Sequence, residues 1–533
     1  MTTEVPLPED NTARFRAALL TVVALAIGLR LWLLFSVRAT EEDFFITLRY
    51  AENIAQGHGF AYNPGVPTLG TTTPLYTLLL ALFLRLHLDP ILGGKLCGIA
   101  ADALACVGVF RLGQAVGRPG AGLAAAVCLA FAPTNLIWAT KGMEVGIVAA
   151  ATVWLWAFYA ERRELPAWAA AAVLLLLRID GAVTVALLLA AMVWREHRIP
   201  WRGLLLFTCL TLPWLLYATV TFGSPLPLSL RAKLIVYGRM IPGRFPHLRE
   251  FLSLMTHNPL GLLMVIGLGV FLLSMVQRWV GAGKERRLSL WQHEGLLLAP
   301  LVGIAIHYGA MALSKVFLFG WYFVPPTPIY YLVALTGWAM LLDRLRPGLA
   351  AKAESRAILL RTVLAGAVLS GAVVPRVVST LREGQRLEDD LRIPMGLWLR
   401  AHSAPTDRIM LEPIGYIGYY SRLPVIDVIA LVSPEALDCY LPAFPSPRHE
   451  LWHRFHPEWV LLRAGEWQEL QRDEAALPTS EHLDQSYSLT KTWPDSSIER
   501  PSFYLFRLKR NQGTTSLDSG PNAIKRRENF SRR

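Results

Sequence analysis

Three consecutive acids stand directly after the first long apolar run, and they are the first candidates for chemistry. They are Glu41, Glu42 and Asp43, and a polar segment with glycine-rich turns at His58 and at residues 63–65 follows them. A carboxylate held at the outer surface of a membrane can remove a proton from an acceptor hydroxyl while a sugar leaves its lipid phosphate. The alternative is a solvated loop with ordinary turn residues. Spacing alone leaves both interpretations open.

More ionisable and aromatic residues stand at the ends of later apolar runs. They are Lys141, Glu144, Arg178, Asp180, His307 and Tyr322. An ionisable residue at membrane depth is by default a candidate functional residue. Structural alternatives exist, because Glu144 suits a helix N-terminus and Arg178 can pair with Asp180 in a tight turn. His307 can be a satisfied polar contact, and Tyr322 suits the interfacial aromatic belt.

The segment over residues 223–258 carries more cations than an outer loop should. Its charged residues are Arg231, Lys233, Arg239, Arg244, Arg249 and Glu250. Outer loops are normally poor in Lys and Arg, so a cation cluster at this place needs an anion. A phosphate group of a substrate at the membrane surface is one candidate. Anionic lipid head groups are the other.

The elements that must position these residues are long apolar runs. Of the 533 residues, 53% are hydrophobic and 17% are charged, which indicates lipid as the solvent. The runs cover residues 17–36, 92–110, 119–138, 145–160, 167–177, 181–194, 203–222, 259–276, 293–313, 321–342 and 357–376. We therefore expect an α-helical polytopic membrane protein with about eleven transmembrane helices. Acids before the first run, and no small-residue cleavage site after it, indicate a retained helix and not a signal peptide.

Loop charge determines the expected topology. Arginines stand before residues 167–177 and after residues 181–194, and both clusters should be cytoplasmic. These two short runs are therefore predicted to be two crossings that turn at Arg178 and Asp180 on the outer side. With a cytoplasmic N-terminus, an odd number of crossings places the C-terminal part outside. Residues 74–86 are apolar but too short to cross, and we predict a juxtamembrane helix at the outer surface there.

The chain is expected to have three parts. Residues 1–376 would form the transmembrane catalytic module, in which residues 37–91 are the first outer loop with its juxtamembrane helices. Residues 377–510 alternate between helix-like and strand-like runs, which predicts a small extracytoplasmic α/β domain. Residues 511–533 are polar and basic, which predicts a disordered tail.

Motifs in the first outer loop resemble the bacterial GT-C membrane glycosyltransferases. In the branch that includes mycobacterial arabinofuranosyltransferases, this loop reads roughly DD-aromatic-I-T-x-R-Y, then G-x-G, N-P-G and T-T-S-P-L. The matching residues here are Glu42-Asp43, Phe45-Ile46-Thr47, Arg49-Tyr50, Gly57-His58-Gly59, Asn63-Pro64-Gly65 and Thr72-Thr73-Pro74-Leu75. Glu42 stands where the branch has Asp, which leaves open which acid is the base. We favour Asp43, because it keeps the residue type of the family.

Later segments resemble the same branch and extend the match over most of the chain. They are Lys141-Gly142-Met143-Glu144 (G-M-E-T in the family), Arg178-Ile179-Asp180-Gly181 (R-P-D-G), residues 222–227 followed by Lys233 (F-G-x-P-x-P and a Lys), residues 413–421 (G-x-x-x-Y-Y-S) and Val425-Ile426-Asp427 (V-x-D). The topology derived from loop charge places all of them on the outer side, which is consistent with one shared site.

The resemblance implies transfer of a sugar from a polyprenyl-phosphate donor to an extracytoplasmic acceptor, by direct displacement with inversion. It implies that Asp43, with Glu42, activates the acceptor. The expected substrate-binding residues are Arg49, His58, Lys141, Glu144, Arg178, Asp180, Arg231, Lys233, His307 and Tyr322. Lys233, Arg231 and Arg178 would hold the donor phosphate. Glu144 and Asp180 would position sugar hydroxyls or a divalent cation, although no ligand spacing demands a metal.

Other classes of function have different requirements. A transporter or lipid-linked sugar flippase would need ionisable residues deep in the membrane core, and often an inverted repeat, and we expect neither. A non-catalytic scaffold would not need the first-loop acids. The net charge of +12 lies mostly in short loops between helices, which argues against nucleic acid as a partner. The expected location is the bacterial inner (plasma) membrane, and the expected partners are the donor, membrane lipids and a glycan, lipid or protein acceptor.

Overall fold

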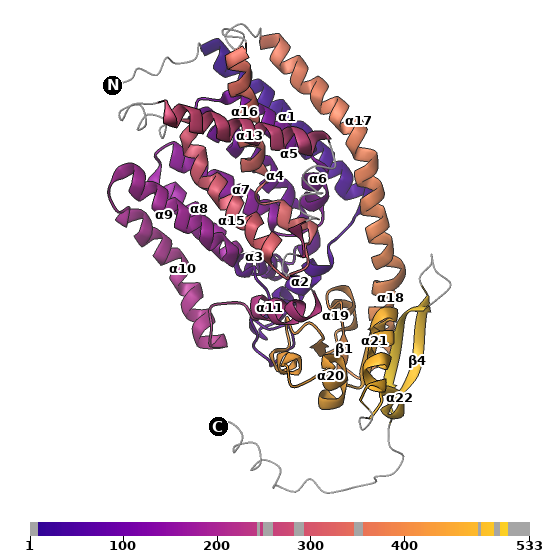
Figure 1. Ribbon diagram of the computed structural model, residues 1–533. Coiled ribbons are helices and arrows are strands. Elements are labelled where there is room, and N and C mark those ends of the chain that lie inside the picture. The colour runs from indigo at the N-terminus through magenta and orange to yellow at the C-terminus, as the bar shows by residue number, and fades with distance from the viewer. Residues whose placement is uncertain are drawn as a thin grey trace.

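The computed structural model describes residues 9–241, 243, 246–248, 259–281, 293–345, 355–477, 481–494 and 501–509. These residues form a helical bundle joined to a smaller domain that contains a β-sheet (Figure 1). The predicted disordered tail, residues 511–533, lies outside the described residues, as do Arg244 and Arg249 of the cation-rich segment.

Each apolar run of the sequence carries a helix of the bundle. The helices are α1 (Glu9–Val37), α4 (Pro90–Ala115), α5 (Pro119–Phe131), α6 (Pro133–Thr140), α7 (Val145–Ala160), α8 (Glu164–Leu177), α9 (Ala182–Glu196), α10 (Trp201–Phe222), α13 (Pro259–Val280), α15 (Leu298–Leu313), α16 (Thr327–Leu345) and α17 (Ser355–Leu387). Within the described ranges, five helices are long and apolar enough to cross a membrane, and α5 with α6 is a sixth candidate with a 56° bend. The bend falls at Ala132, because Pro133 disfavours a helical conformation in the residue before it.

The two short runs between residues 164 and 196 form an antiparallel pair of helices. At one end, Arg178 after α8 donates to Glu144 before α7 at 3.2 Å. At the other end, Arg198 after α9 pairs with Glu164 at the start of α8, also at 3.2 Å. The chain therefore traverses the bundle in both directions between Glu164 and Arg198. The prediction of two helices instead of one long helix is confirmed.

Charged residues also gather at the end of the bundle opposite Glu144. Arg118, between α4 and α5, pairs with Glu294 before α15 at 2.8 Å. Arg278, near the end of α13, pairs with the same glutamate at 3.3 Å. These residues come from loops that the charge rule assigns to the cytoplasm. The fold thus brings the expected cytoplasmic loops together at one end and the expected outer loops together at the other.

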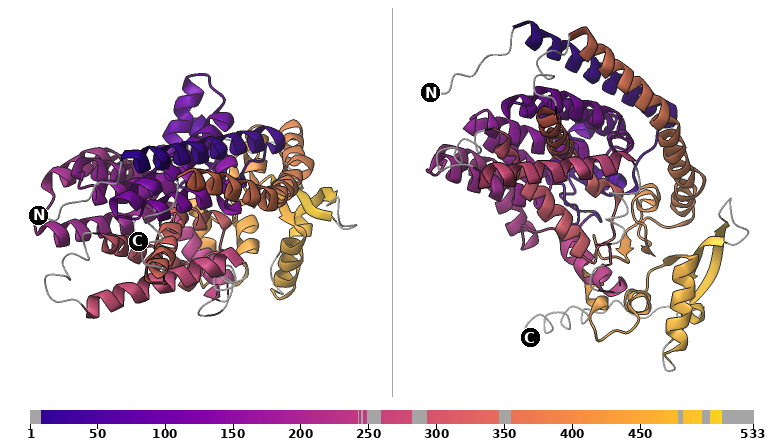
Figure 2. Two further views of the ribbon diagram at one scale, coloured as in Figure 1. Left: turned by 90° about the horizontal axis from the view of Figure 1, so that it is seen from above. Right: turned by 45° about the horizontal axis from the view of Figure 1, so that its top comes forward.

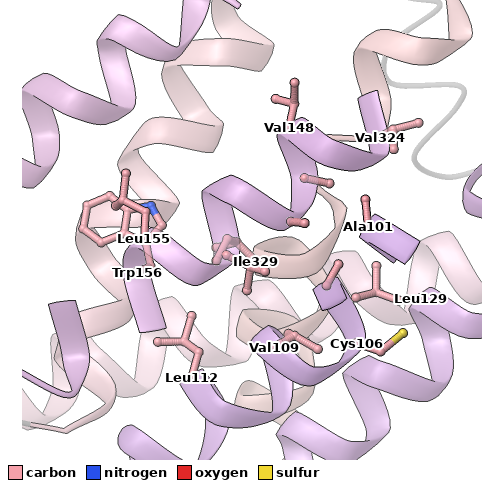
Figure 3. Packing of buried hydrophobic residues seen from close by; sticks show 14 of the residues in the cluster. Ala101, Cys106, Val109, Leu112, Leu129, Val148, Leu155, Trp156, Val324 and Ile329 are labelled. Carbon is pink, nitrogen blue, oxygen red and sulfur yellow. The ribbon is translucent and has the colours of Figure 1, made fainter. Parts of the chain in front are cut away.

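The core of the bundle consists of aliphatic, aromatic and small side chains. Val109 of α4, Trp156 of α7 and Ile329 of α16 belong to one buried cluster (Figure 3). Glycine lets α13 and α16 approach closely, because a Cβ at Gly337 would overlap the carbonyl oxygen of Gly267. Membrane helices depend on such close packing. Lipid tails are as apolar as the helix surfaces, so no hydrophobic force drives the helices together.

A buried ion pair inside the bundle corrects one expectation from the sequence. Arg30 of α1 donates to the carboxylate of Asp102 in α4 at 2.6 Å, and both side chains are almost fully buried. The same guanidinium donates to the carbonyl oxygens of Leu129 and Ala130. The expectation of no charge deep in the membrane core is therefore wrong. Each charge stands alone in a long apolar run, so the run was still interpreted as a membrane-spanning helix. The two charges are tolerated inside the bundle because each neutralises the other.

The first outer loop contains two helices that pack on the bundle. These are α2 (Glu42–Ala55) and α3 (Pro74–Arg85). Most side chains of α2 are buried, whereas α3 exposes Leu78 and Leu82. The helix predicted over residues 74–86 is thus confirmed as a helix, and its exposed leucines suit a position against lipid.

The small domain is built on a five-stranded mixed sheet with the order β2-β1-β3-β5-β4. The strands are β1 (Ile409–Leu411), β2 (Val425–Asp427), β3 (Trp459–Arg463), β4 (Tyr487–Pro494) and β5 (Pro501–Leu508). Strand β1 is parallel to β2 and β3, and β5 is antiparallel to β3 and β4. These strands, together with the helices between them, agree with the predicted alternation of helix-like and strand-like runs.

A continuous helical rod connects the two parts of the molecule. Helix α17 passes residue 376 and is followed by a π-helical turn, η4 (Glu388–Arg392), and by α18 (Ile393–His402). Figure 2 shows α17 beside α1 along the bundle, where Leu33 packs with Val377 and Leu381. The rod brings the C-terminal domain to the end of the bundle where the first outer loop lies.

Candidate active site

The three first-loop acids have different partners. Glu41 pairs with Lys141 of the second outer loop at 2.6 Å. Glu42 accepts a hydrogen bond from the backbone N–H of Gly415 in the C-terminal domain. Asp43 lies beside them in the first turn of α2, where the helix dipole favours negative charge. One short stretch of chain therefore links two outer loops and the sheet domain.

Asp43 is a buried acid with a cation in its surroundings. Burial raises the pKa of Asp43 above its ordinary value, and the charge of Glu144 adds to that rise. The charge of Lys233 opposes it. Lys233 belongs to α11 (Leu228–Met240), which follows α10 in the cation-rich segment. The structure thus brings the favoured base and the favoured phosphate ligand of the sequence analysis into electrostatic contact.

Arg178 holds two carboxylates from two outer loops. It donates to Glu144 at 3.2 Å and to Asp180 at 3.0 Å. Its guanidinium carbon lies 5.7 Å from the ring centre of Tyr322. The pairing of Arg178 with Asp180, which was the structural alternative, is present, and Glu144 joins it. Asp180 and Arg178 lie at η1 (Ile179–Gly181), the turn between α8 and α9.

Tyr322 connects Arg178 to two further predicted residues. Its backbone oxygen lies 3.0 Å from Nε2 of His307 in α15. Its hydroxyl lies 3.5 Å from Nζ of Lys233, which is a long contact for a hydrogen bond. Tyr322 itself is in η3 (Gly320–Phe323), before α16. The predicted residues that meet here, called the polar cluster below, are Asp43, Glu144, Arg178, Asp180, Lys233, His307 and Tyr322.

Arg49 and Lys141 are engaged outside the polar cluster. Arg49 donates to the backbone oxygens of Tyr62, Gly418 and Leu423 at 3.0, 2.6 and 2.7 Å. Its Nε thus binds within the first outer loop, and its two terminal nitrogens hold that loop against the C-terminal domain. Lys141 pairs with Glu41 and lies over the ring of Trp138. The described contacts of both residues thus join the first outer loop to its neighbours.

His58 and Arg231 are exposed. His58 lies in the turn after α2, and in the described part of the chain none of its side-chain contacts joins it to the polar cluster. Arg231 is on α11 but on a different face from Lys233, since two residues along a helix are about 200° apart. Arg239 of the same helix donates to backbone oxygens of the C-terminal domain, among them Phe444 at 2.6 Å. The cation-rich segment therefore contributes one described cation, Lys233, to the cluster.

The sequence analysis missed several groups near the first-loop acids. Glu388 of η4 pairs with Arg392 at 2.7 Å, and burial raises the pKa of Glu388 to about 7. Glu52 of α2 pairs with Arg422 and accepts a hydrogen bond from Tyr419 at 2.7 Å. The i,i+4 spacing of Glu388 and Arg392 is a local signal that could have been noticed. No local pattern could have revealed the contacts of Glu52, because its partners come from the other end of the chain.

An apolar groove of about 450 Å³ lies between α3, α8 and α10. Its lining includes Leu78 of α3, Leu176 of α8 and Leu210 of α10. A smaller pocket shares Leu176 with the groove and is also lined by Ile179, between Arg178 and Asp180, and by Pro227, which precedes α11. Apolar surface therefore runs from the groove to the neighbourhood of the polar cluster.

The acids of the site are engaged by cations and backbone groups. Among the residues that the structure describes, no three His, Cys, Asp or Glu side chains gather as ligands of one metal ion. Glu144 and Asp180 both face Arg178. The arrangement is thus suited to binding through charge-assisted hydrogen bonds and to proton transfer by a carboxylate.

Comparisons with known proteins show which solved structures have a similar fold. A protein-family profile, described as a domain of unknown function (DUF8728), matches residues 379–513, and no curated protein matches the chain. The chain is similar to the ArnT structure from Cupriavidus metallidurans bound to undecaprenyl phosphate, with 12% identity, 91% of this chain and 97% of that chain covered, and a TM-score of 0.55. It is also similar to the archaeal oligosaccharyltransferase AglB from Archaeoglobus fulgidus in complex with an inhibitory peptide and a dolichol-phosphate, with 12% identity, 84% and 69% coverage, and a TM-score of 0.53. The predicted GT-C fold is confirmed, and the chain is a mostly helical protein with the GT-C fold and a small C-terminal sheet domain.

Proposed function

We propose that this protein is a membrane glycosyltransferase that moves a sugar from a polyprenyl-phosphate donor to an acceptor outside the cytoplasm. The observation that carries the proposal is the polar cluster itself. A buried carboxylate, Asp43, lies in the field of Lys233, and apolar surface leads from this neighbourhood to a groove on the bundle. A base, a phosphate ligand and a place for a lipid chain are the three requirements of this reaction.

Asp43 is the proposed general base. It would take the proton from an acceptor hydroxyl, whose oxygen then attacks the anomeric carbon of the sugar. The bond between that carbon and the phosphate oxygen breaks, and its electron pair stays on the departing polyprenyl phosphate. A single displacement of this kind inverts the anomeric centre. Glu42 is turned to the C-terminal domain, and this supports Asp43 as the acid that meets the acceptor.

Lys233 is the proposed ligand of the donor phosphate. In the described part of the chain, no carboxylate lies within ion-pair distance of its ammonium group, and its partner is the distant hydroxyl of Tyr322. Arg178 is already held by Glu144 and Asp180. A phosphate would therefore bind the ammonium group of Lys233, whereas Arg178 would hold Glu144 and Asp180 in place. Stabilising the charge that develops on the leaving phosphate lowers the barrier of the reaction.

The apolar groove is the proposed place of the prenyl chain. Its volume of about 450 Å³ and its lining by leucine and aromatic side chains suit a branched hydrocarbon. The similar ArnT structure holds undecaprenyl phosphate, and the similar AglB structure holds dolichol-phosphate. These two ligands support a lipid-linked donor for this chain as well. The acceptor would be a cell-wall glycan, a lipid or a protein.

The proposed topology has eleven crossings in the inner membrane, with the N-terminus inside and the C-terminal domain outside. The pair α8 and α9 supports the odd number of crossings. Two helices in this region, instead of one long helix, change the predicted total from ten to eleven. The ion pairs of Arg118 and Arg278 with Glu294 gather basic residues at the end that would face the cytoplasm. The polar cluster and the sheet domain would then share the outer side.

A reconstituted transfer assay tests the function. The purified full-length chain in vesicles is given short-chain polyprenyl-phosphate sugars on the side of the C-terminal domain, with a glycan or lipid acceptor. Formation of a glycosidic product with release of polyprenyl phosphate supports the proposal. Movement of the lipid-linked sugar across the bilayer without any glycosidic product would instead support a flippase, and the proposal would fall.

A further inference from the structure

The C-terminal domain makes direct contact with the acids of the first outer loop. Its turn over residues 413–421 follows β1 and contains α19 (Tyr416–Ser421). The backbone N–H of Gly415 donates to Glu42, and the hydroxyl of Tyr416 donates to the backbone oxygen of Thr40 at 3.2 Å. The ring centres of Phe45 and Tyr416 are 4.2 Å apart. The turn therefore packs on both sides of Glu42 and Asp43.

Two glycines allow the backbone of this turn to come so close. A Cβ at position 415 would overlap the backbone oxygen and the carboxylate of Glu42. A Cβ at position 418 would overlap the hydroxyl of Tyr62. The oxygen of Gly418 also accepts a hydrogen bond from Arg49 at 2.6 Å. Both contacts depend on the absence of a side chain, so the turn is fitted to the first outer loop at the level of the backbone.

The contact with Gly415 separates the roles of two adjacent acids. Glu42 is directed to the C-terminal domain, whereas Asp43 lies in the field of Lys233 and Glu144. Burial, followed by the charge of Asp43, raises the pKa of Glu42 well above its ordinary value. The Gly415 N–H occupies one oxygen of Glu42, and this hydrogen bond opposes the rise in pKa because it stabilises the ionised form of the carboxyl. Among the described contacts, the turn therefore holds Glu42 and not Asp43.

We propose that the Gly415–Gly418 turn of the C-terminal domain is a positioning element of the active site, which holds Glu42 so that Asp43 alone acts as the base. This inference rests on the proposed function for its catalytic meaning. Its structural content, the fixed orientation of Glu42, does not. It gives the domain of unknown function a role at the reacting groups that is distinct from binding an acceptor.

The test compares glycine variants by infrared spectroscopy of the purified full-length chain. Subtracting the spectrum of a Glu42→Gln variant isolates the band of the protonated Glu42 carboxyl, which is followed against pH. The variant is Gly415→Ala, and the control is Gly465→Ala, an exposed glycine of the same domain where a Cβ meets nothing within 4 Å. Thermal unfolding and binding of farnesyl phosphate show whether each variant keeps its fold.

We expect the wild type and Gly465→Ala to keep a protonated Glu42 to a similar pH. Gly415→Ala should shift the band and raise the pH at which it disappears by about one unit or more, a tenfold change in proton affinity, because the lost N–H donor stabilises the ionised carboxylate more than the neutral acid. If Gly415→Ala does not fold, Glu42→Asp replaces it, because the shorter acid cannot reach the N–H of Gly415 and adds no atoms. A band unchanged in Gly415→Ala, or a Glu42→Asp variant whose shortened carboxyl titrates like the native Glu42, would overturn the proposal.

Turnover links this geometry to catalysis. With a short-chain polyprenyl-phosphate sugar, Gly415→Ala should lower kcat about tenfold or more and leave the KM for the donor nearly unchanged. In a Glu42→Ala background the same glycine substitution should cost little further activity, because residues that act as a unit are not additive. Additive losses would show that the turn acts independently of Glu42. If even the wild type transfers no sugar, the proposed function fails, while the infrared result still decides the positioning of Glu42.

Discussion

Arg178 reaches Glu144, a residue of another outer loop, at 3.2 Å, and both side chains are largely buried. The same guanidinium holds Asp180 at 3.0 Å. Two carboxylates thus neutralise the guanidinium of Arg178. Lys233, by contrast, has only the long contact to Tyr322 among its described contacts. The difference supports the proposal that Lys233, and not Arg178, binds the donor phosphate.

The first prediction is that Lys233→Ala weakens both donor binding and turnover, whereas Arg231→Ala does not. Both residues are on α11, but Arg231 is exposed and Lys233 faces the cluster. Charge-assisted hydrogen bonds in a partly dry site are about twice as strong as neutral ones. A head-group contact at the surface should cost about 1 kcal/mol per charge. The measurement is a donor titration of transfer with each variant, and equal small losses would show that α11 is only an anchor for lipid.

The second prediction is that Asp43→Asn abolishes transfer without disturbing the fold. Loss of a general base typically lowers the rate by about two to four orders of magnitude. Burial raises the pKa of Asp43, and only its deprotonated form can accept a proton. Activity of the wild type should therefore fall with decreasing pH at values above the ordinary pKa of an aspartate. Turnover of purified Asp43→Asn near the wild-type rate would remove Asp43 from the mechanism and direct the search to Glu42.

Much of the polar cluster could be predicted from the sequence because its members stand at the ends of apolar runs. Loop charge places those ends on one side of the membrane, so Asp43, Glu144 and Arg178 were expected to be neighbours. The hydrogen bond from Gly415 to Glu42 could not be predicted, because a backbone N–H leaves no trace in the side-chain sequence.

Pairings inside the bundle were also beyond the sequence. Arg30 and Asp102 each lie within apolar residues, and only the packing of α1 against α4 shows that they meet. The same holds for Arg49, whose motif suggested a substrate but whose nitrogens hold backbone oxygens of the C-terminal domain. Local patterns predict which helix ends share one side of the membrane, whereas the partner of a residue depends on how distant helices pack.

The third prediction concerns the apolar groove. Leu210→Trp should fill part of it and raise the KM for long-chain donors more than for short-chain donors, because a larger side chain takes the volume of the prenyl chain. Leu205→Trp is the matched control, since Leu205 is on α10, exposed, and absent from the groove lining. Transfer rates with donors of increasing chain length provide the measurement. An equal effect of both variants at all lengths would argue against a prenyl chain in this groove.

The fourth prediction is topological. A reporter fused after residue 400, in α18, should be active outside the cytoplasm, and one at residue 285 should be active inside. The physical reason is the distribution of Arg and Lys between the two ends of the bundle, together with the two crossings of α8 and α9. Reporter activity in intact cells is the measurement. A cytoplasmic signal from the fusion after residue 400 would remove the proposed outer location of the polar cluster.

The last prediction uses Glu388 to test the junction of α17 with the C-terminal domain. Burial raises the pKa of this carboxyl from 4.5 to about 7. Between these values the folded protein keeps a proton that the unfolded chain has lost, so the free energy of unfolding falls as pH rises. The slope from one such group is at most about 1.4 kcal/mol per pH unit. Glu388→Gln carries no titrating proton, and its melting temperature should therefore depend less on pH across this window than that of the wild type.

Asp390→Asn, an exposed neighbour in the same turn, should follow the wild-type curve. Parallel curves for wild type and Glu388→Gln would show that Glu388 is ionised in the folded protein, held by Arg392 instead of neutralised by burial.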